Sequence, residues 1–332
     1  MIKLGTIGTN WITDKFIDAA KNSKKYELAA VYSRSETKAG EYAKKHGAQA
    51  AFANIDDFFA SDKFDTVYIA SPNSAHFEQA KQAIIAGKNV IVEKPAFLNQ
   101  KEMTDIQTLL AEHPDVLLFE AARNVHTENF KLVKQQVNKM AVVTGAEFTY
   151  SKYSSRYDKV LAGETPNVFS LQYGGGALQD LGVYTVYDAV ALFGVPEEVA
   201  YFPSIIATGV DGKGTAILKY PDFNVTLNFS KISNSQMPSE VSGLKDFVEM
   251  DDAGELTTIA YFDGDTKETL STPSEDNPML GEVLDFASVI EQPDSDDSKR
   301  DYTKWTQMSI DVNKVMYNLR QDAKLVFVGE TD

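Results

Sequence analysis

Two side chains that can carry out acid–base chemistry stand four residues apart near the middle of the chain. Asp180 and Tyr184 fall in a stretch predicted to form a helix that begins near Ala177, and residues four apart on a helix share one face. A tyrosine hydroxyl can give and accept a proton, and a carboxylate can orient a hydroxyl group beside it. The spacing therefore favours proton transfer at this face. The alternative is an amphipathic core helix in which Tyr184 is packed and Asp180 caps the helix or faces water.

A lysine follows a predicted strand in the segment Glu93-Lys94-Pro95. The carboxyl ends of parallel strands are where doubly wound sheets bind ligands, and a cation there can stabilise negative charge that develops on a reacting oxygen. A tyrosine beside such a lysine would have its phenolate form favoured. We therefore predict that Lys94 polarises the substrate, that Tyr184 gives and takes the proton, and that Asp180 orients either a substrate hydroxyl or Lys94. The alternative for Lys94 is a solvated strand end.

A glycine ends the first predicted strand, where backbone N–H groups can approach a pyrophosphate at the start of a helix. A complete G-x-G-x-x-G fingerprint would need glycines at positions 10 and 13, where this chain has Asn10 and Thr13. Asn10 is tolerable in place of glycine, because asparagine visits left-handed backbone conformations more easily than other non-glycine residues. The alternative is an ordinary turn glycine. The residues predicted to contact the phosphates are Gly8, Thr9, Asn10, Trp11 and Ile12.

The second predicted strand ends at Tyr32 and is followed by Ser33 and Arg34, with Lys38 one helical turn further on. An NAD site usually places Asp or Glu here for the ribose 2′-hydroxyl. A guanidinium and a hydroxyl suit a 2′-phosphate instead, because the first can bind it bidentately and the second can donate to it. We predict a preference for NADP(H), with NAD(H) possible. The alternative is a solvated arginine and lysine at a helix start.

Two types of pattern divide the chain and predict an α/β protein of two domains. Residues 1–122 alternate short apolar runs with amphipathic stretches, which indicates a Rossmann-type doubly wound parallel sheet. Residues 123–332 have period-two strands among helices, which indicates an α+β domain with a mostly antiparallel open sheet. In the first domain the expected strands are Ile2–Ile7, Glu27–Tyr32, Thr66–Ala70, Asn89–Val92 and Val116–Phe119, and the expected helices are Trp11–Asn22, Glu36–His46, Ala75–Ala86 and Gln100–His113. In the second they are helices Glu128–Asn138, Leu178–Phe193 and Tyr302–Arg320, strands Ala146–Tyr153, Thr215–Tyr220 and Asn224–Lys231, and loops Thr272–Pro278 and Gln292–Asp301.

Composition limits the classes of partner. The formal net charge of −16 opposes binding to nucleic acid and to anionic membranes. The absence of cysteine excludes disulfides, thiol nucleophiles and Cys-ligated zinc, and four scattered histidines make a metal site unexpected. The chain has neither a cleavable signal pattern nor a long apolar span, so we expect a cytoplasmic protein.

Three segments together resemble the Gfo/Idh/MocA family of oxidoreductases (glucose–fructose oxidoreductase and inositol dehydrogenase). They are Ile69-Ala-Ser-Pro-Asn-Ser-Ala-His76, Ala86-Gly-Lys-Asn-Val-Ile-Val-Glu-Lys-Pro95 and Gly174-Gly-Gly-Ala-Leu-Gln-Asp-Leu-Gly-Val-Tyr184. Many relatives have histidine at the position of Tyr184. Tyrosine at this position resembles the dihydrodiol/xylose dehydrogenase-like branch of the family. The resemblance implies a Rossmann domain followed by an α+β domain whose open sheet carries oligomer contacts, and we expect a homodimer or homotetramer.

The resemblance also implies site residues. It places Glu93 and Lys94 at the nicotinamide, and it makes the segment from residue 153 to residue 168 part of a substrate wall. An alternative for the residues before the helix at 75–86 is a capped helix start, with Asn73 or Ser74 as the cap. The residues implied to line the ribose and nicotinamide are Ala70, Ser71, Pro72, Asn73 and His76. The expected substrate contacts are Arg123, Tyr153, Arg156 and Asn167.

The resulting expectation is an NAD(P)-dependent dehydrogenase or reductase acting on a sugar, a polyol or another small vicinal hydroxyl or carbonyl compound. Hydroxyls, amides and arginines in the expected wall suit such a substrate better than a lipid. The family resemblance leaves two rivals. One is an NAD-dependent glycosidase that reduces its cofactor only transiently, and the other is a non-catalytic regulator that senses dinucleotide. Lys94, Asp180 and Tyr184 together argue against the regulator.

Overall fold

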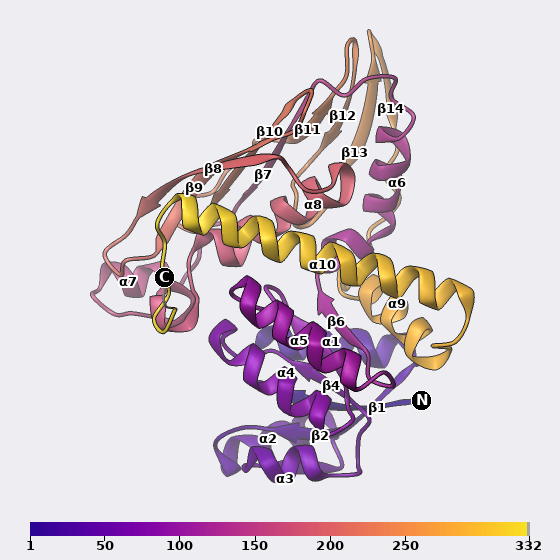
Figure 1. Cartoon of the computed structure of the whole chain (residues 1–332), viewed down its shortest axis with the longest axis vertical. Helices are drawn as coiled ribbons and strands as arrows, with labels where there is room; N and C mark the ends of the chain where they lie inside the picture. Colours follow the sequence, from indigo (N-terminus) through magenta and orange to yellow (C-terminus); the bar gives the residue numbers. More distant parts are fainter. Residues whose placement is uncertain (331–332) are drawn as a thin grey trace. The chain divides into compact units, whose positions relative to one another are not determined.

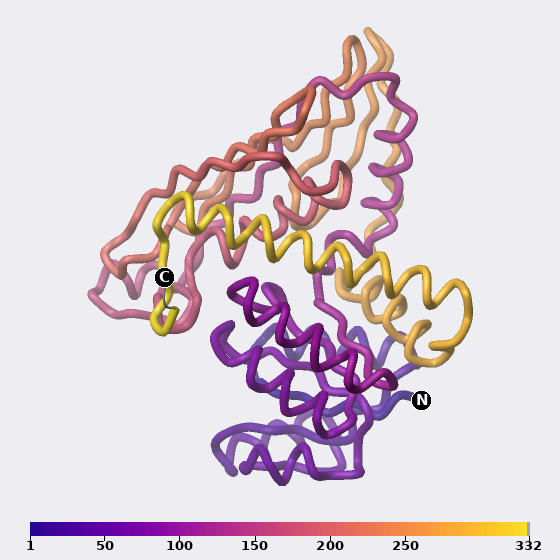
Figure 2. Tube along the Cα trace, viewed as in Figure 1, coloured from indigo at the N-terminus to yellow at the C-terminus, as the bar shows by residue number. Residues whose placement is uncertain are grey.

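The computed structural model describes residues 1–330, which divide into two compact units. Unit 1 contains Met1–Ala121 and Glu275–Ser309, and unit 2 contains Ala122–Ser274 and the described residues from Ile310 onward. The division after Ala121 lies one residue from the boundary expected at 122. Sequence analysis does not predict the return of residues 275–309 to unit 1. Figure 2 shows this orange segment beside the first strand and helix, where its helix α9 (Leu280–Glu291) packs against both.

Unit 1 is built on a six-stranded parallel sheet in the order β3-β2-β1-β4-β5-β6 (Figure 1). The strand order reverses between β1 and β4, which is the point where open α/β sheets bind ligands at the carboxyl ends of their strands. The strands are β1 (Ile2–Ile7), β2 (Tyr26–Tyr32), β3 (Ala50–Phe52), β4 (Thr66–Ile69), β5 (Asn89–Glu93) and β6 (Leu118–Ala121), and the helices besides α9 are α1 (Trp11–Ser23), α2 (Glu36–His46), α3 (Ile55–Ala60), α4 (His76–Ile85) and α5 (Gln100–Glu112).

Helix ends in unit 1 follow local side-chain chemistry. Asn10, Ser35, Asn54 and Asn99 accept backbone N–H groups at the starts of α1, α2, α3 and α5. Gly87 follows α4 with φ +69°, a left-handed conformation that favours glycine at the end of a helix. Sequence analysis missed β3 and α3, because three and six residues are too few to show a period.

Unit 2 is built on an eight-stranded sheet in the order β14-β13-β12-β11-β7-β10-β9-β8. Only β7 and β10 pair in parallel among these described strands, and the expected α/β fold with a mostly antiparallel second sheet is confirmed. The strands are β7 (Gly145–Ser151), β8 (Glu198–Ile205), β9 (Asp211–Lys219), β10 (Asn224–Ser230), β11 (Ser239–Ser242), β12 (Asp246–Met250), β13 (Ile259–Asp263) and β14 (Thr266–Thr269). The helices of its first segment are α6 (Glu128–Val137), α7 (Tyr157–Leu161) and α8 (Val183–Phe193).

The two faces of this second sheet differ. Helix α8 packs on β7 and β10 and covers one face. On the other face the alternating side chains reach solvent, and Phe202 on β8 is 62% exposed. Three glutamates lie in register there on neighbouring strands: Glu147 opposite Glu240, and Glu240 opposite Glu249. Like charges directly opposite one another destabilise a sheet. Strand pairing therefore does not explain why three glutamates occur in this row.

The last long helix corrects one loop prediction. The loop expected at Thr272–Pro278 is confirmed, but the loop expected at Gln292–Asp301 is wrong from Asp296 onward, where α10 (Asp296–Asp322) begins. Acidic residues suggest a loop by composition, yet Asp296 and Asp297 occupy the first turn of a helix, where negative charge is favourable.

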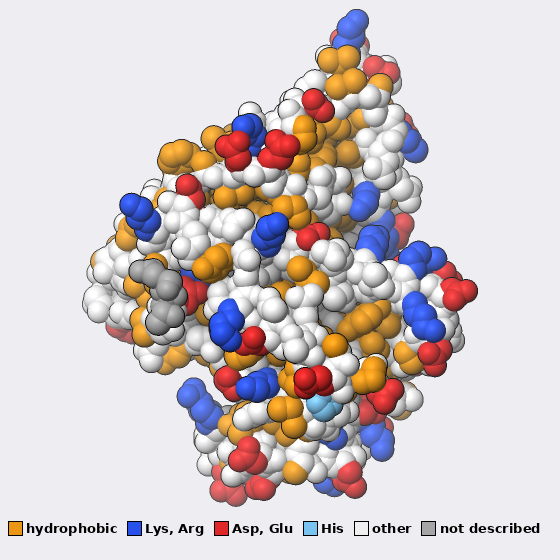
Figure 3. All heavy atoms as spheres, in the orientation of Figure 1, with side chains coloured by type: hydrophobic (Ala, Val, Ile, Leu, Met, Phe, Trp, Pro, Cys, Tyr) orange, Lys and Arg blue, Asp and Glu red, His pale blue; other side chains and the backbone are white. Residues whose placement is uncertain are grey.

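Charges are mixed on the surface. On the face drawn in Figure 3, lysines and arginines lie among aspartates and glutamates. None of the helices in residues 1–330 is long and apolar enough to cross a membrane. The same residues include no group of three or more His, Asp or Glu side chains placed to hold a metal ion.

Candidate functional site

Gly8 forms the turn between β1 and α1 at the switch point of the sheet. Its φ is +113°, and a Cβ built on it would lie 2.7 Å from the carbonyl oxygen of Ala70 at the end of β4. Only glycine accepts both the conformation and the close approach. The turn therefore has the geometry that the phosphate prediction requires.

Asn10 begins α1 without the left-handed conformation that asparagine tolerates. Its backbone is extended, with φ −103° and ψ 175°. Its Oδ1 accepts from the N–H groups of Ile12 at 3.0 Å and Thr13 at 3.3 Å, and its Nδ2 donates to Ala70 O at 3.0 Å. Asparagine therefore replaces glycine as a helix cap that also fastens the turn to β4.

Three backbone N–H groups at this turn are open to a ligand. Within residues 1–330, nothing accepts from the N–H groups of Thr9, Asn10 and Trp11. Unpaired donors at a helix N-terminus bind anions through their hydrogen bonds and the helix dipole. The turn therefore fits the pyrophosphate of a dinucleotide, and contact with the predicted residues from Gly8 to Ile12 stays a prediction.

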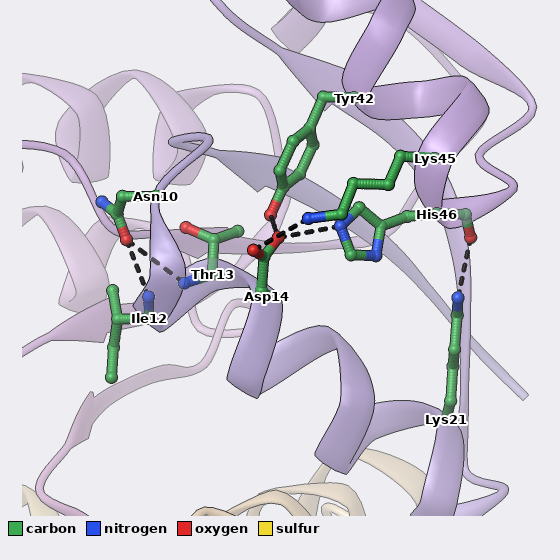
Figure 4. A network of polar contacts seen from close by, with 8 residues as sticks. All are labelled: Asn10, Ile12, Thr13, Asp14, Lys21, Tyr42, Lys45 and His46. Atoms are coloured by element: carbon green, nitrogen blue, oxygen red, sulfur yellow. Dashed lines mark hydrogen bonds and ion pairs between the residues drawn. The ribbon is translucent and has the colours of Figure 1, made fainter.

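A polar network that the sequence did not reveal joins α1 to α2 (Figure 4). Asp14 accepts from Tyr42 Oη at 2.7 Å and Lys45 Nζ at 2.9 Å, and it lies 2.8 Å from His46 Nε2. Burial alone would raise the pKa of Asp14, but these hydrogen bonds outweigh it and lower the pKa below its usual value. Lys21 adds a bond to the carbonyl oxygen of His46 at 2.8 Å. The network holds together the two helices whose N-termini carry the predicted phosphate contacts.

The end of β2 presents no carboxylate. Ser33, Arg34 and Ser35 follow Tyr32, and the first acidic residue is Glu36 on α2. Ser35 caps α2 by accepting from Lys38 N at 3.4 Å, while the side chains of Arg34 and Lys38 are exposed. Two exposed cations and the hydroxyl of Ser33 thus follow β2, and their contact with a 2′-phosphate stays a prediction.

His76 is enclosed by backbone groups, and its predicted contact with the cofactor stays a prediction. It is fully buried, with Nδ1 3.0 Å from Pro95 O and Nε2 3.0 Å from Ser71 O. Burial lowers its pKa, against the hydrogen bonds to Pro95 and Ser71, which raise it. The proposed cap is wrong, because neither Asn73 nor Ser74 caps a helix. The ring instead holds the segment after β4 against the segment after β5.

Lys94 lies half-buried between two anchored neighbours. Glu93 ends β5, is 7% exposed and accepts from Tyr68 Oη at 2.5 Å. Pro95 is held by His76, and Ala96 N donates to Glu120 Oε1 at 3.0 Å. The backbone on both sides of Lys94 is therefore rigid, as the positioning of a reacting cation requires. Ala70, Ser71, Pro72 and Asn73 follow β4 at the same carboxyl edge, and their cofactor contacts stay predictions.

Gly175 and Gly176 allow close packing in unit 2, and a Cβ on Gly175 would lie 2.7 Å from the carbonyl carbon of Val168. Gly176 has φ +126°, and a Cβ there would overlap Asp211 Oδ1. Asp211 accepts from Leu178 N at 2.6 Å and from Tyr201 Oη at 2.6 Å. Burial raises the pKa of Asp211, while these hydrogen bonds lower it. The buried carboxylate thereby anchors the start of the segment that carries Asp180.

That segment is not the regular helix expected from Ala177. Residues Leu178–Gly182 form a π-helical turn, and the α-helix α8 starts only at Val183. The four-residue rule for a shared face therefore does not apply between Asp180 and Tyr184. The two side chains have different partners: Asp180 Oδ2 lies 2.5 Å from Lys231 Nζ, and the Tyr184 hydroxyl accepts from Arg123 Nε at 3.3 Å.

Tyr184 is 6% exposed and is surrounded by polar and aromatic groups of unit 2. The guanidinium of Arg123 lies 5.2 Å from its ring centroid, and the ring of Tyr150 lies edge-on at 5.3 Å. Arg123 was predicted to contact substrate, but it is 8% exposed and bonded to Tyr184. Burial opposes its charge, yet its neighbours Tyr184, Tyr150 and Glu255 raise the pKa of Arg123. The cation that unit 2 itself places beside the phenol is therefore an arginine, and the role predicted for Lys94 stays a prediction.

The sequence analysis missed two buried residues behind Tyr184. Asn124 Nδ2 donates to the carbonyl oxygen of Tyr184 at 3.3 Å and to Asp188 Oδ1 at 2.8 Å. Burial raises the pKa of Asp188 well above its usual value. The pair fixes the backbone that carries the phenol, and no spacing in the sequence links residues so far apart.

The other three predicted substrate contacts, Tyr153, Arg156 and Asn167, lie on the segment after β7. Tyr153 donates to Asp158 Oδ1 at 2.6 Å and its ring packs against Tyr157 at 6.0 Å. Arg156 is exposed, and Asn167 starts a 3-10 turn that continues to Phe169. The structure tests none of these three as a substrate contact, and they stay predictions.

Comparison with known proteins decides the family. The sequence profile of Gfo/Idh/MocA proteins, described as "Oxidoreductase family, NAD-binding Rossmann fold", matches residues 2–121. The scyllo-inositol 2-dehydrogenase (NADP(+)) IolU of Bacillus subtilis is 38% identical over 332 residues, which cover 99% of this chain and 99% of that protein. The chain belongs to the Gfo/Idh/MocA oxidoreductase family. It is therefore an NAD(P)-binding enzyme, and the resemblance inferred from three segments is confirmed.

Two further proteins are similar to this chain over most of its length. A trans-1,2-dihydrobenzene-1,2-diol dehydrogenase of Macaca fuscata fuscata is 24% identical over 277 residues, covering 82% of this chain and 81% of that protein. KijD10, a 3-ketoreductase from Actinomadura kijaniata solved with NADP and TDP-benzene, has a TM-score of 0.83 at 18% identity, with 97% of each chain covered. At that identity the likeness of structure shows the shared fold.

Proposed function

We propose that this protein is a cytoplasmic, NADP(H)-preferring oxidoreductase whose substrate is a polyol of the inositol type or a related sugar. The observation that carries the proposal is the match along the whole chain to a scyllo-inositol dehydrogenase that uses NADP(+). The end of β2 supports the cofactor preference, because Arg34 and Lys38 stand there without a carboxylate before Glu36.

The site residues divide the work of the reaction. The nicotinamide, when bound, gives or accepts a hydride. The donors from Thr9 to Trp11 hold its phosphates, and Lys94 stabilises the negative charge on the reacting oxygen. Tyr184 gives or takes the hydroxyl proton, and Arg123 Nε orients it by donating to its oxygen at 3.3 Å. Asp180 accepts a hydrogen bond from a second substrate hydroxyl.

A panel of substrates tests this proposal directly. Scyllo-inositol, myo-inositol, glucose, xylose and a trans-cyclohexanediol are incubated with NADP+ and with NAD+, and nicotinamide absorbance is followed. We expect net reduction of NADP+ with at least one cyclic polyol. A glycosidase would release sugar from a glycoside without net change in absorbance, and a regulator would bind dinucleotide without turning over any substrate. Either result would contradict the proposal.

Arg34→Ala should weaken NADP(H) binding selectively. Removing one charge-assisted hydrogen bond to a phosphate typically costs about 1.5–3 kcal/mol, so NADP(H) affinity should fall roughly tenfold or more while NAD(H) affinity stays nearly unchanged. Isothermal titration with each cofactor measures the difference. Lys44→Ala, an exposed lysine further along α2, is the matched control and should leave both affinities unchanged. Equal affinities of the wild type for NADP(H) and NAD(H) would rule out the assignment.

We also propose that the open face of the second sheet binds a second copy of this chain. The row of Glu147, Glu240 and Glu249 would be stabilised by cations from a partner, and the same face presents Lys213 and Lys219 on β9. A face that carries both charges can complement itself across a two-fold axis. Light scattering at micromolar concentration should show a dimer or tetramer, and Phe202→Asp should shift it toward monomer. A wild type that is monomeric there would contradict the proposal.

A further inference from the structure

A buried lysine outside the predicted set lies behind Asp180. Lys231 follows β10, and its backbone N–H donates to Gly212 O at 2.8 Å, which extends the pairing with β9 by one residue. Its side chain is 1% exposed, among the largest fully buried side chains of the described chain. The sequence alone places Lys231 only at the end of a strand.

The ammonium group of Lys231 lies between three groups of unit 2. Nζ is 2.5 Å from Asp180 Oδ2 and 3.1 Å from the carbonyl oxygen of Val168, and it lies 4.5 Å from the ring centroid of Phe169. One cation thus holds both the π-helical turn with Asp180 and the 3-10 turn that begins at Asn167. Each of these two segments carries a residue predicted to contact substrate, Asp180 on one and Asn167 on the other.

The two members of the Lys231–Asp180 ion pair differ in their exposure to solvent, and this difference determines how the pair can act on a ligand. The Lys231 side chain is shut off from water, whereas the Asp180 side chain is 40% exposed. A buried ion pair stabilises a fold no better than apolar residues of similar size, so stability does not account for the lysine. The arrangement does hold a carboxylate from behind in one orientation while solvent, or a ligand, reaches it from the front.

We propose that Lys231 is a positioning residue that fixes Asp180 to accept a hydroxyl of an uncharged polyol. The inference rests on the proposed function. The ammonium cancels the charge of the carboxylate, so the pair has no net attraction for a cationic substrate and offers hydrogen-bond acceptance instead. The same ammonium sets the distance between the Asp180 turn and the Asn167 turn through Val168. The residue thereby selects for neutral hydroxyl compounds without touching them.

Lys231→Met tests the proposal, because it keeps the length and packing of the side chain and removes its charge. With NADP+ and the best polyol of the panel, we expect KM to rise roughly 10–100-fold, the range typical when a residue that orients a functional group is removed. The NADP+ dissociation constant should stay unchanged. Lys245→Met, at an exposed lysine between β11 and β12, is the matched control and should behave as wild type.

A double-mutant cycle separates positioning from a general loss of structure. If Lys231 acts through Asp180, then adding Lys231→Met to Asp180→Asn should change KM by less than about twofold, because coupled residues are not additive. A full additional loss in that background would overturn the proposal. Lys231→Gln, which can still donate to the Val168 carbonyl, replaces Lys231→Met if circular dichroism shows that the latter is unfolded. If both variants are unfolded, Lys231 is a structural residue and the proposal fails.

Failure of the two proposals can be told apart. A wild type that turns over none of the polyols refutes the proposed function, and the inference about Lys231 falls with it. A wild type that is active, with a Lys231→Met variant of unchanged KM, refutes only the inference.

Discussion

Tyr184→Phe should lower turnover by a factor on the order of 10²–10⁴, because it removes the proton that is exchanged with substrate. The substitution preserves the ring, and with it the packing against Tyr150 and the contact with the Arg123 guanidinium. Steady-state kcat with the best polyol of the panel, measured over a range of pH, gives the size of the effect. Cofactor affinity should change far less than turnover, since the phosphates supply most of that binding.

The matched control for this variant is Tyr187→Phe, which removes a hydroxyl one turn away on the same helix α8. It should keep turnover close to that of the wild type. If Tyr184→Phe also kept near wild-type turnover at every pH, Tyr184 would be a packed core residue. Proton transfer would then belong to Lys94 or to water held by Asp180.

Lys94→Ala should lower turnover by about 10²–10³, the usual cost of removing one electrostatic donor from a developing oxyanion. The anchored neighbours Glu93 and Pro95 should keep the backbone in place, so the loss reports the ammonium itself. Added alkylamines should restore part of the activity, which is measured as kcat at rising amine concentration.

Lys101→Ala, at an exposed lysine on α5, is the control for Lys94→Ala and should retain full turnover with no response to amine. A different result would reassign Lys94. If NADP(H) affinity fell as far as turnover, the lysine would be a cofactor-binding residue rather than one that stabilises the reacting oxygen.

Hydrophobic period and local capping made most of unit 1 predictable. The apolar run of β1 and the amphipathic α2 have the bounds expected from the sequence, Ile2–Ile7 and Glu36–His46. The helix begins and ends with residues that act locally, Ser35 at its start and Gly47 at its end. Residues 275–309 pack on α1 through contacts more than 250 positions apart in the chain, and no local pattern encodes such contacts.

The residue types of the site could be predicted, but their partners could not. Asp180, Tyr184 and Lys94 stand out by motif, whereas the bond from Arg123 to Tyr184 spans 61 positions and appears only when the chain is folded. His76 shows the same limit, since its motif suggests contact with cofactor but does not reveal its two backbone partners, Pro95 and Ser71. Sequence motifs indicate the kind of chemistry, whereas tertiary packing determines the hydrogen-bond partners of each motif residue.

The π-helical turn at Leu178–Gly182 contains one residue more than an α-helical turn would need to span the same distance. An α-helix advances by about 100° per residue, so deleting a single residue from this turn would let the segment continue as an ordinary α-helix into α8 and would rotate everything before the deletion by that angle. The backbone would gain regular hydrogen bonds, but Asp180 would turn away from Lys231. At Gly182 the turn packs closely on β10, because a Cβ there would lie 3.1 Å from the ring of Phe229. This contact helps to fix the rotation of the turn about the helix axis. Insertion and deletion, more than substitution, are therefore the changes to which the direction of this carboxylate is most sensitive.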